Sequence, residues 1–408
     1  MDRFAPVEEM ARTTFGAAPR WRFLVPGRLE VFGKHTDYAG GHALVAAVPR
    51  GFAVAALARS DGRVVVADAR SGELFECPTD APAVHVTGWR RYVATVVRRL
   101  SSNFPGADLS TSIVFSSDVP PASGISSSSA LVISIAESVI ARAGLEQTER
   151  WRAAIRGLEE RAAYFGCLEN GAAFGQLAGN DGVGTHGGSE DHAAILASRA
   201  GHLLLCAFSP LRFVRPVRMP EGWTFVVASS GVRASKTGGA QRDYNRLAAS
   251  AAAIVAAWRS RHPGDPRSLA ELASSAPLDT LPLERALAER LEHFVRENAR
   301  VGDAAEALAR GDLERLGVLA DESQRDAARL LRNQVPETID LVSMGKDLGA
   351  VAASAFGAGW GGSVWALVSE AAADEFAGRW LRAYADRHPH AAAEAFVSPP
   401  SDGILRYQ

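Results

Sequence analysis

The order of apolar and polar positions along the chain predicts a mixture of strands and helices. Short apolar runs bounded by Gly, Asp or Ser are typical of strands, and they occur at 52–58, 63–69, 111–117, 193–198, 202–208 and 224–230. Apolar residues at helical spacing predict helices at 89–102, 126–144, 148–166, 244–258 and 303–324. Residues 350–387 have the pattern of a strand, a glycine-rich turn, a strand and a helix.

The distribution of these elements predicts two domains. Strands and helices mix in the first half, and helices dominate from about residue 240. A chain of 408 residues is also too long for one ordinary hydrophobic core. We therefore predict an α+β fold with domains at 1–210 and 211–408.

Composition narrows the class of protein. The chain is 47% hydrophobic and has 44 basic against 46 acidic residues, so its net charge of −2 gives no footprint for nucleic acid or an anionic membrane. Cys77, Cys167 and Cys206 have no metal-binding or redox spacing and indicate reduced thiols. The first residues lack a signal segment, and no uncharged apolar run reaches the roughly 18 residues of a membrane span. We expect a cytoplasmic enzyme.

Residues 118–131, "DVPPASGISSSSAL", have the pattern of an anion-binding loop. The prolines end a strand, Gly124 permits unusual backbone angles, and serines lead into a helix. A helix N-terminus has unpaired N–H groups that attract phosphate. The serine hydroxyls either cap this helix or reach a phosphate-bound magnesium ion. The length and composition of the loop favour phosphate.

Residues 357–362, "GAGWGG", formally match the dinucleotide motif GxGxxG. That motif must open a helix early in a βαβ unit, whereas this one precedes the strand-like "SVWALVS". The dinucleotide interpretation therefore fails. A glycine turn that approaches a ligand, or a structural hairpin, remains.

Residues 27–38, "GRLEVFGKHTDY", concentrate ionisable groups. The near-match to a Walker loop has one residue too many, and His35 stands where Ser or Thr is required. Carboxylates, imidazole and cations suit the hydroxyl groups of a sugar. The alternative is a surface turn with mutual salt bridges.

Together and in this order, the three motifs resemble those of the GHMP small-molecule kinases and, within them, the galactokinases. "PGRLEVFGKHTDYAGG" resembles P-G-R-x-N-L-I-G-E-H-x-D-Y-x-x-G, "VPPASGISSSSA" resembles V-P-x-G-G-G-L-S-S-S-A, and "AFGAGWGGSVWAL" resembles T-G-x-G-F-G-G-x-x-x-x-L. "WRRYV", "GGSEDHAAIL" and "SSGVRASKTGGAQRDYNRL" are weaker matches to W-x-N-Y-V, C-G-I-M-D-Q-F-I-S-L and N-S-x-V-R-H-S-L-x-S-S-x-Y-x-x-R-R. The resemblance extends from about residue 14 to 370.

The resemblance implies a two-domain α+β fold with the active site in the cleft between the domains. It implies that ATP with Mg2+ lies over the serine loop, and that Asp191 and Arg28 are catalytic. It places substrate contacts at Lys34, His35, Asp37, Gly188 and Tyr244. It places ATP contacts at Trp89, Ser123, Gly124, Ile125, Ser126, Ser127, Ser128 and Ser129, and metal contacts at Ser128 and Asp181.

Three positions depart from the family pattern. Lys34 replaces a sugar-binding Glu, and Glu30 replaces Asn. The expected magnesium-binding Glu aligns with Gly179, which leaves Asp181 as the substitute, with Asn180 or Glu190 as alternatives.

The resemblance implies an ATP-dependent sugar 1-kinase, with galactose as the default substrate because His35, Asp37 and Tyr244 are kept. Lys34 raises the alternative of an acidic sugar such as galacturonate, unless it pairs with Glu30. A catalytically silent sugar or ATP sensor is a further alternative, against which the retention of Arg28 and Asp191 argues. A dinucleotide oxidoreductase is the remote third. We expect a monomer or small homo-oligomer, with no nucleic-acid or membrane partner.

Overall fold

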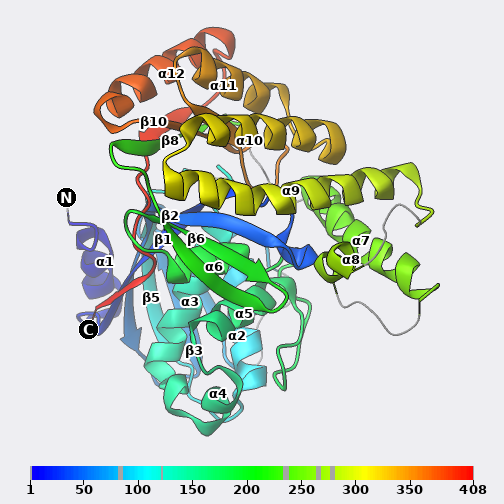
Figure 1. Ribbon diagram of the computed structural model, residues 1–408. Helices are drawn as coiled ribbons and strands as arrows, with labels where there is room; N and C mark the ends of the chain where they lie inside the picture. Colours follow the sequence, from blue (N-terminus) through cyan, green and yellow to red (C-terminus); the bar gives the residue numbers. More distant parts are fainter. Residues whose placement is uncertain are drawn as a thin grey trace.

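The computed structural model describes residues 2–80, 86–120, 123–232, 239–262, 268–275 and 281–407 (Figure 1). The strands are β1 (Trp21–Phe32), β2 (His42–Ala58), β3 (Arg63–Asp68), β4 (Leu74–Pro78), β5 (Thr111–Ser117), β6 (His202–Phe208), β7 (Leu211–Arg218), β8 (Trp223–Ser229), β9 (Ala352–Ala355), β10 (Ser363–Ser369), β11 (Glu394–Val397) and β12 (Leu405–Tyr407).

The helices are α1 (Ala5–Phe15), α2 (Arg90–Asn103), α3 (Ser127–Ala143), α4 (Glu149–Ala154), α5 (Leu158–Asn170), α6 (Glu190–Ala197), α7 (Gly239–Arg259), α8 (Leu269–Ser275), α9 (Arg285–Arg310), α10 (Leu313–Asp326), α11 (Pro336–Asp347) and α12 (Ala373–Arg387). Short helical turns are η1 (Asp37–Ala39), η2 (Leu145–Gln147), η4 (Ala327–Leu331) and η5 (Glu370–Ala372).

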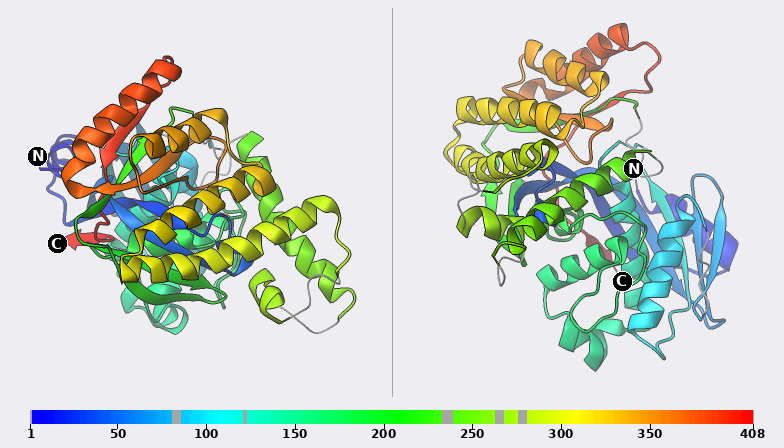
Figure 2. Two further views of the ribbon diagram at one scale, coloured as in Figure 1. Left: turned by 45° about the horizontal axis from the view of Figure 1, so that its top comes forward. Right: turned by 90° about the vertical axis from the view of Figure 1, so that its right-hand side faces the viewer.

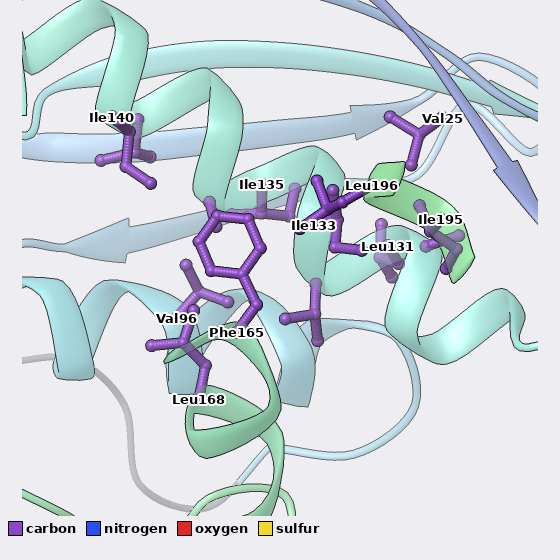
Figure 3. Close-up of a cluster of buried hydrophobic side chains, with 14 of the residues drawn as sticks. Val25, Val96, Leu131, Ile133, Ile135, Ile140, Phe165, Leu168, Ile195 and Leu196 are labelled. Carbon is purple, nitrogen blue, oxygen red and sulfur yellow. The ribbon is translucent and has the colours of Figure 1, made fainter. Parts of the chain in front are cut away.

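The larger sheet has the order β12-β1-β2-β5-β3-β4, and β6 and β7 extend it from the first part of β2. One face is covered by α2, α3, α5 and α6, whose apolar residues form a continuous core with β1 and β2 (Figure 3). The other face packs on α1 at one end. Its remaining part packs on α9, α10 and the smaller sheet.

The smaller sheet has the order β11-β8-β10-β9, and α11 and α12 cover its outer face. Its inner face packs on the larger sheet beside α9 and α10, and α11 and α12 lie on its far side (Figure 2). Helices α7 and α8 pack on the N-terminal half of α9 and form a lobe at the side of the molecule (Figures 1 and 2). The α+β class predicted from the sequence is confirmed.

Three predicted elements differ from the structure. Residues 193–197 of the strand predicted at 193–198 belong to helix α6, because a short apolar run cannot distinguish a buried helix from a strand. The helix predicted at 148–166 is interrupted by extended residues at Ile155 and Gly157, which separate α4 from α5. The helix predicted at 303–324 is divided at Gly311, whose left-handed φ of 68° ends α9 before Asp312 caps α10.

The predicted domain boundary at 210/211 divides the hairpin formed by β6 and β7. Because β7 pairs with β6 from Leu211 to Arg218, we propose that the boundary lies after β7. Strand β12 follows the second domain in the chain and pairs with β1. Within the described residues, no helix is both long and apolar enough to cross a membrane.

Candidate active site

A cavity of about 50 Å³ is lined by residues of two of the three sequence motifs, 27–38 and 357–362. It is bounded by β1, the turn after it, the α5–α6 connection, α7 and the glycine turn at 357–362. The lining residues are Arg28, Glu30, His35, Asp37, Gly166, Glu169, Asn170, Thr185, Gly187, Gly188, Glu190, Asp191, His192, Tyr244, Gly357 and Ala358. Five of these are acidic and one is an arginine, so electrostatics dominate the site.

Arg28 and Asp191 form an ion pair inside the cavity. Arg28 and Glu30 are two residues apart on β1, so both point away from the apolar core that contains Leu29. The Arg28 Nε donates to Asp191 Oδ1 at 2.7 Å, and Nη1 donates to the Gly124 carbonyl at 2.6 Å. Although burial opposes it, the negative charges of Asp191, Glu190 and Glu30 raise the pKa of Arg28. Arg28 therefore connects the carboxylate to the serine loop.

The serine loop leads into α3 with strained geometry. Ser126 has a left-handed φ of 56°, which is uncommon for a residue other than glycine. Its hydroxyl is buried and has no hydrogen-bond partner within the described residues. Strain of this kind concentrates at ligand sites. Ser127 and Ser128 are half-buried at the first turn of α3.

Ser129 points inward between two carboxylates. Its Oγ lies 2.7 Å from Glu169 Oε2 and 3.0 Å from Asp191 Oδ2. One hydroxyl proton can serve only one of these oxygens at a time. The arrangement places Glu169 and Asp191 on opposite sides of a single hydroxyl.

The glycine turn packs directly on the serine loop. The Ser363 hydroxyl donates to the Ser123 carbonyl at 2.6 Å. A Cβ on Gly357 would lie 3.2 Å from the Gly124 carbonyl, so the absence of a side chain allows the two loops to touch. The turn is a contact between the two domains.

His35 and Asp37 line the cavity from the turn after β1. His35 Nδ1 lies 2.8 Å from the Tyr38 hydroxyl and Nε2 lies 3.1 Å from the Ala358 carbonyl. Burial, followed by the charge of Arg290, lowers the pKa of His35 to about 3, so the ring is neutral. Both ring nitrogens therefore have protein partners.

Asp37 is fixed by close backbone contact. A Cβ on Gly188 would lie 2.4 Å from Asp37 Oδ2, which explains the glycine there. Burial raises the pKa of Asp37, and backbone bonds from Tyr38 and Glu190 oppose that rise.

Tyr244 enters the cavity from α7. Gln241 and Asn245 on the same helix donate to the Gly184 carbonyl at 2.8 and 2.9 Å. A Cβ on Gly187 would lie 3.0 Å from the Tyr244 hydroxyl. Helix α7 is thus docked on the loop that precedes α6.

Lys34 does not line the cavity, unlike the sequence prediction for this residue. Its Nζ donates to Ser323 Oγ at 2.7 Å and to Ser354 Oγ at 2.9 Å. Burial lowers the pKa of Lys34, and the charge of Glu297 opposes that shift most strongly. Glu297 Oε1 accepts from the Ser323 hydroxyl at 2.9 Å. Hence the amino group connects the turn after β1 to α9, α10 and β9, and the predicted pair with Glu30 is not its hydrogen-bonded contact.

Trp89, Asp181 and the predicted ATP contacts at 123–129 also lie outside the lining of the cavity. Trp89 is at the start of α2, where its indole N–H donates to Glu73 Oε2 at 2.9 Å and its ring packs on Phe75 and Phe115. Asp181 is exposed in the loop between α5 and α6. The described residues contain no cluster of three His, Cys, Asp or Glu side chains arranged to hold a metal ion.

Glu169 is the site residue that the sequence reasoning missed. It stands near the C-terminal end of α5, and the loop that follows separates it from Asp191 by 22 positions. The resemblance to the family placed the expected acid at Gly179. The predicted helix at 148–166 ends before Glu169, so the only available signal was an acid between that helix and a glycine-rich loop.

Glu30 and Glu190 meet beside Arg28. Both are buried, and their carboxyl groups are in contact. Glu190 Oε1 lies 3.7 Å from Arg28 Nε.

Comparison with family models agrees with the three motifs. The model described as "GHMP kinases N terminal domain" matches residues 91–166, and "GHMP kinases C terminal" matches 304–386. The model described as "Galactokinase galactose-binding signature" matches residues 12–58.

Similar proteins cover nearly the whole chain. A Chloroflexus aggregans protein named galactokinase is 31% identical over 91% of this chain and 90% of its own. One from Mycobacterium bovis (strain BCG / Pasteur 1173P2) is 32% identical over 84% of this chain and 87% of its own. The crystal structure of Lactococcus lactis galactokinase complexed with galactose covers 98% of this chain and 99% of its own, with a TM-score of 0.81 and 22% identity. That match shows the shared fold.

Proposed function

Because the chain belongs to the galactokinase family of the GHMP kinases and is a sugar kinase that uses ATP, we propose that it phosphorylates the anomeric hydroxyl of a hexose, with galactose as the default substrate. The observation that carries the proposal is the Asp191 carboxylate. It is held by Arg28 at 2.7 Å inside a cavity that His35, Asp37 and Tyr244 also line.

Phosphoryl transfer depends mainly on positioning and on neutralising charge. Asp191 accepts the proton of the anomeric hydroxyl, since its pairing with Arg28 favours the ionised carboxylate. Arg28 also bonds to Gly124 in the serine loop, so it lies between the acceptor site and the expected phosphate site. There its fixed charge stabilises the transferring phosphoryl group.

The serine loop is the proposed phosphate site. Gly124 and Ser126 have left-handed backbones, and the amide groups at the start of α3 are oriented donors for phosphate oxygens. The buried Ser126 hydroxyl has no partner within the described residues, which is consistent with a ligand oxygen as its partner. Ser123, Ile125 and Ser127 complete the proposed loop, and Trp89 remains a proposed neighbour of the adenine.

The oxygen-rich surroundings of α3 also fit a magnesium ion. Magnesium prefers carboxylate and hydroxyl oxygens together with phosphate oxygens. We propose that Ser128 and Glu169 hold it, in place of the predicted Asp181, because Ser129 next to Ser128 is bonded to Glu169 at 2.7 Å. Bound there, magnesium would neutralise charge on the phosphates.

The position of Lys34 and the charge of the cavity bear on whether the substrate is an acidic sugar or a neutral hexose. The acidic-sugar hypothesis depended on Lys34 facing the substrate, but the Lys34 amino group is bonded to Ser323 and Ser354 outside the cavity. The cavity itself is rich in carboxyl groups, which disfavour an anionic sugar. A neutral hexose is therefore the better-supported substrate.

A coupled ADP-release assay over galactose, glucose and galacturonate tests the proposal. We expect galactose to give the highest kcat/KM. Asp191→Asn should lower kcat by about 10²–10⁴-fold and leave ATP affinity nearly unchanged. The exposed Asp181→Asn serves as the matched control. Full turnover by Asp191→Asn would reject the base assignment, and ATP binding without turnover of any sugar would favour the sensor alternative.

A further inference from the structure

Two glutamates from distant parts of the chain face each other beneath the Arg28–Asp191 pair. Glu30 lies on β1, on the same face as Arg28, and Glu190 is the first residue of α6, next to Asp191. Both side chains line the cavity, and each residue is only 4% exposed. Burial raises the pKa of Glu30 and a hydrogen bond from Glu190 lowers it, so the two carboxyl groups are in contact.

A hydrogen bond between two carboxyl groups requires a proton. An ionised carboxylate has only acceptor atoms, so two ionised carboxylates cannot bond to each other. Two adjacent negative charges out of contact with water are also costly, and one group keeps its proton instead. The arrangement therefore contains one acid and one carboxylate, related by a shared proton.

The charges around this pair act in opposite directions. Arg28 and Lys34 favour its ionised form, whereas other acidic groups and burial favour the protonated form. The titratable and charged groups that face it are Arg28, Lys34, Asp37, Tyr38, Asp191, Cys206, Tyr244 and Glu297.

The directions of the pKa shifts agree with a retained proton. Burial raises the pKa of Glu30 to about 7 against the charges of Arg28 and Lys34. Burial, followed by the charge of Glu30, raises the pKa of Glu190 well above its ordinary value. A raised pKa keeps a carboxyl protonated to higher pH, so the pair keeps its last proton to a higher pH than an ordinary carboxyl does.

The shared proton affects the position of the Arg28 guanidinium. Its Nε donates to Asp191 Oδ1 at 2.7 Å, while Glu190 Oε1 is 3.7 Å from the same atom and too distant for a hydrogen bond. A second negative charge on the glutamates would draw the guanidinium away from Asp191. We propose that Glu30 and Glu190 share one proton and, in that form, act as a positioning pair that keeps Arg28 on Asp191. This inference rests on the proposed kinase function and adds residues to it.

The first test compares pH profiles of galactose phosphorylation. In the wild type, kcat should fall at alkaline pH while the KM for ATP stays constant. Glu190→Gln fixes the singly charged form, because its amide can still donate to Glu30. We expect this variant to lose the alkaline fall, so that its ratio of alkaline to neutral kcat exceeds that of the wild type several-fold. Identical profiles for the two proteins would overturn the positioning role.

Glu190→Ala is the matched variant that cannot donate a hydrogen bond. It should lower kcat more than Glu190→Gln at every pH. Equal kcat values for the two variants would count against the inference, since a role limited to filling space does not distinguish them in this way. Glu30→Gln provides a second route should either Glu190 variant fold poorly by circular dichroism.

The second test needs no sugar. Infrared difference spectra between neutral and alkaline pH should show the loss of a carbonyl stretching band from a protonated carboxylic acid. We expect the band to be absent in Glu190→Gln and retained in Asp37→Asn, which removes a different acid of the cavity. A spectrum without the band, or a band that survives in Glu190→Gln, would overturn the shared proton. Lack of galactose turnover by the wild type would reject only the proposed function, and the infrared result would still decide the inference.

Discussion

The environment of Lys34 gives the sharpest quantitative prediction. Replacing it by Met keeps the length of the side chain but removes two hydrogen bonds from an ammonium group, at 2.7 and 2.9 Å. Bonds to a charged group contribute about 1.5–3 kcal/mol each, or about 3–6 kcal/mol for two. Loss of one member of a buried ion pair costs about 3–5 kcal/mol. We therefore expect Lys34→Met to lower the free energy of unfolding by about 3–5 kcal/mol.

Urea denaturation followed by tryptophan fluorescence measures this loss. The KM for galactose, measured well below the unfolding transition, should change less than about twofold because the amino group lies outside the cavity. Wild-type stability together with a changed preference between galactose and galacturonate would refute the reasoning and return Lys34 to the substrate site.

A second substitution isolates the electrostatic part of the loss in the free energy of unfolding. Glu297→Gln on the Lys34→Met background removes the carboxylate that Lys34 no longer balances. Arg300, which donates to Glu297 at 3.2 Å, keeps Asp326 and Glu322 as partners. We expect the double variant to recover about 1–2 kcal/mol, a coupling within the range for residues of one network. Strict additivity would show that Glu297 and Lys34 do not interact.

The remaining predictions concern the metal, the glycine turn and acid stability. Glu169→Gln should weaken Mn2+ binding to the ATP complex at least about tenfold by electron paramagnetic resonance, whereas Asp181→Asn should not; equal affinities would exclude Glu169 as a ligand. Gly359→Ala should lower Tm, because φ is +87° and a Cβ would lie 2.4 Å from the Asn333 carbonyl; an unchanged Tm would refute the close packing. The pKa of about 3 for His35 lies below its unfolded value of about 6.5, so its stability contribution is complete above about pH 6.5 and is lost as pH falls towards 3. Asn tolerates the left-handed backbone of this position. His35→Asn should therefore make the free energy of unfolding depend less on pH in that window, and an unchanged slope would contradict this.

Local pattern was sufficient for most of the architecture. The strand, glycine turn, strand and helix predicted for 350–387 correspond to β9, the turn, β10 and α12. The failure at α6 has a physical cause, since its five apolar residues are too few to show a period. Only packing against β1, β2 and α5 makes this segment a helix.

The candidate site could be predicted where its residues belong to motifs that follow the order of the family pattern. His35, Asp37, Gly188 and Tyr244 line one cavity with Arg28 and Asp191, although they come from both halves of the chain. The direction of a single side chain could not be predicted. Lys34 points away from the cavity because two serines about 290 and 320 positions later receive its amino group.

Glu169 shows a different limit. Its contact with Asp191 through Ser129 depends on the path of the α5–α6 loop, which no spacing rule describes. Residue types and their order therefore identify the members of a site more readily than the contacts between those members, because the contacts depend on long-range packing.

The pairing of β12 with β1 has a consequence for how the protein folds. Leu24 pairs with Leu405, so the two strands that meet are almost the whole chain apart. The contact is among the least local in the molecule, and the closure of so long a loop is slow compared with the formation of local helices. The larger sheet is therefore completed only after the second domain has emerged from the ribosome. Until then, β1 is an open edge available for unwanted pairing with other chains.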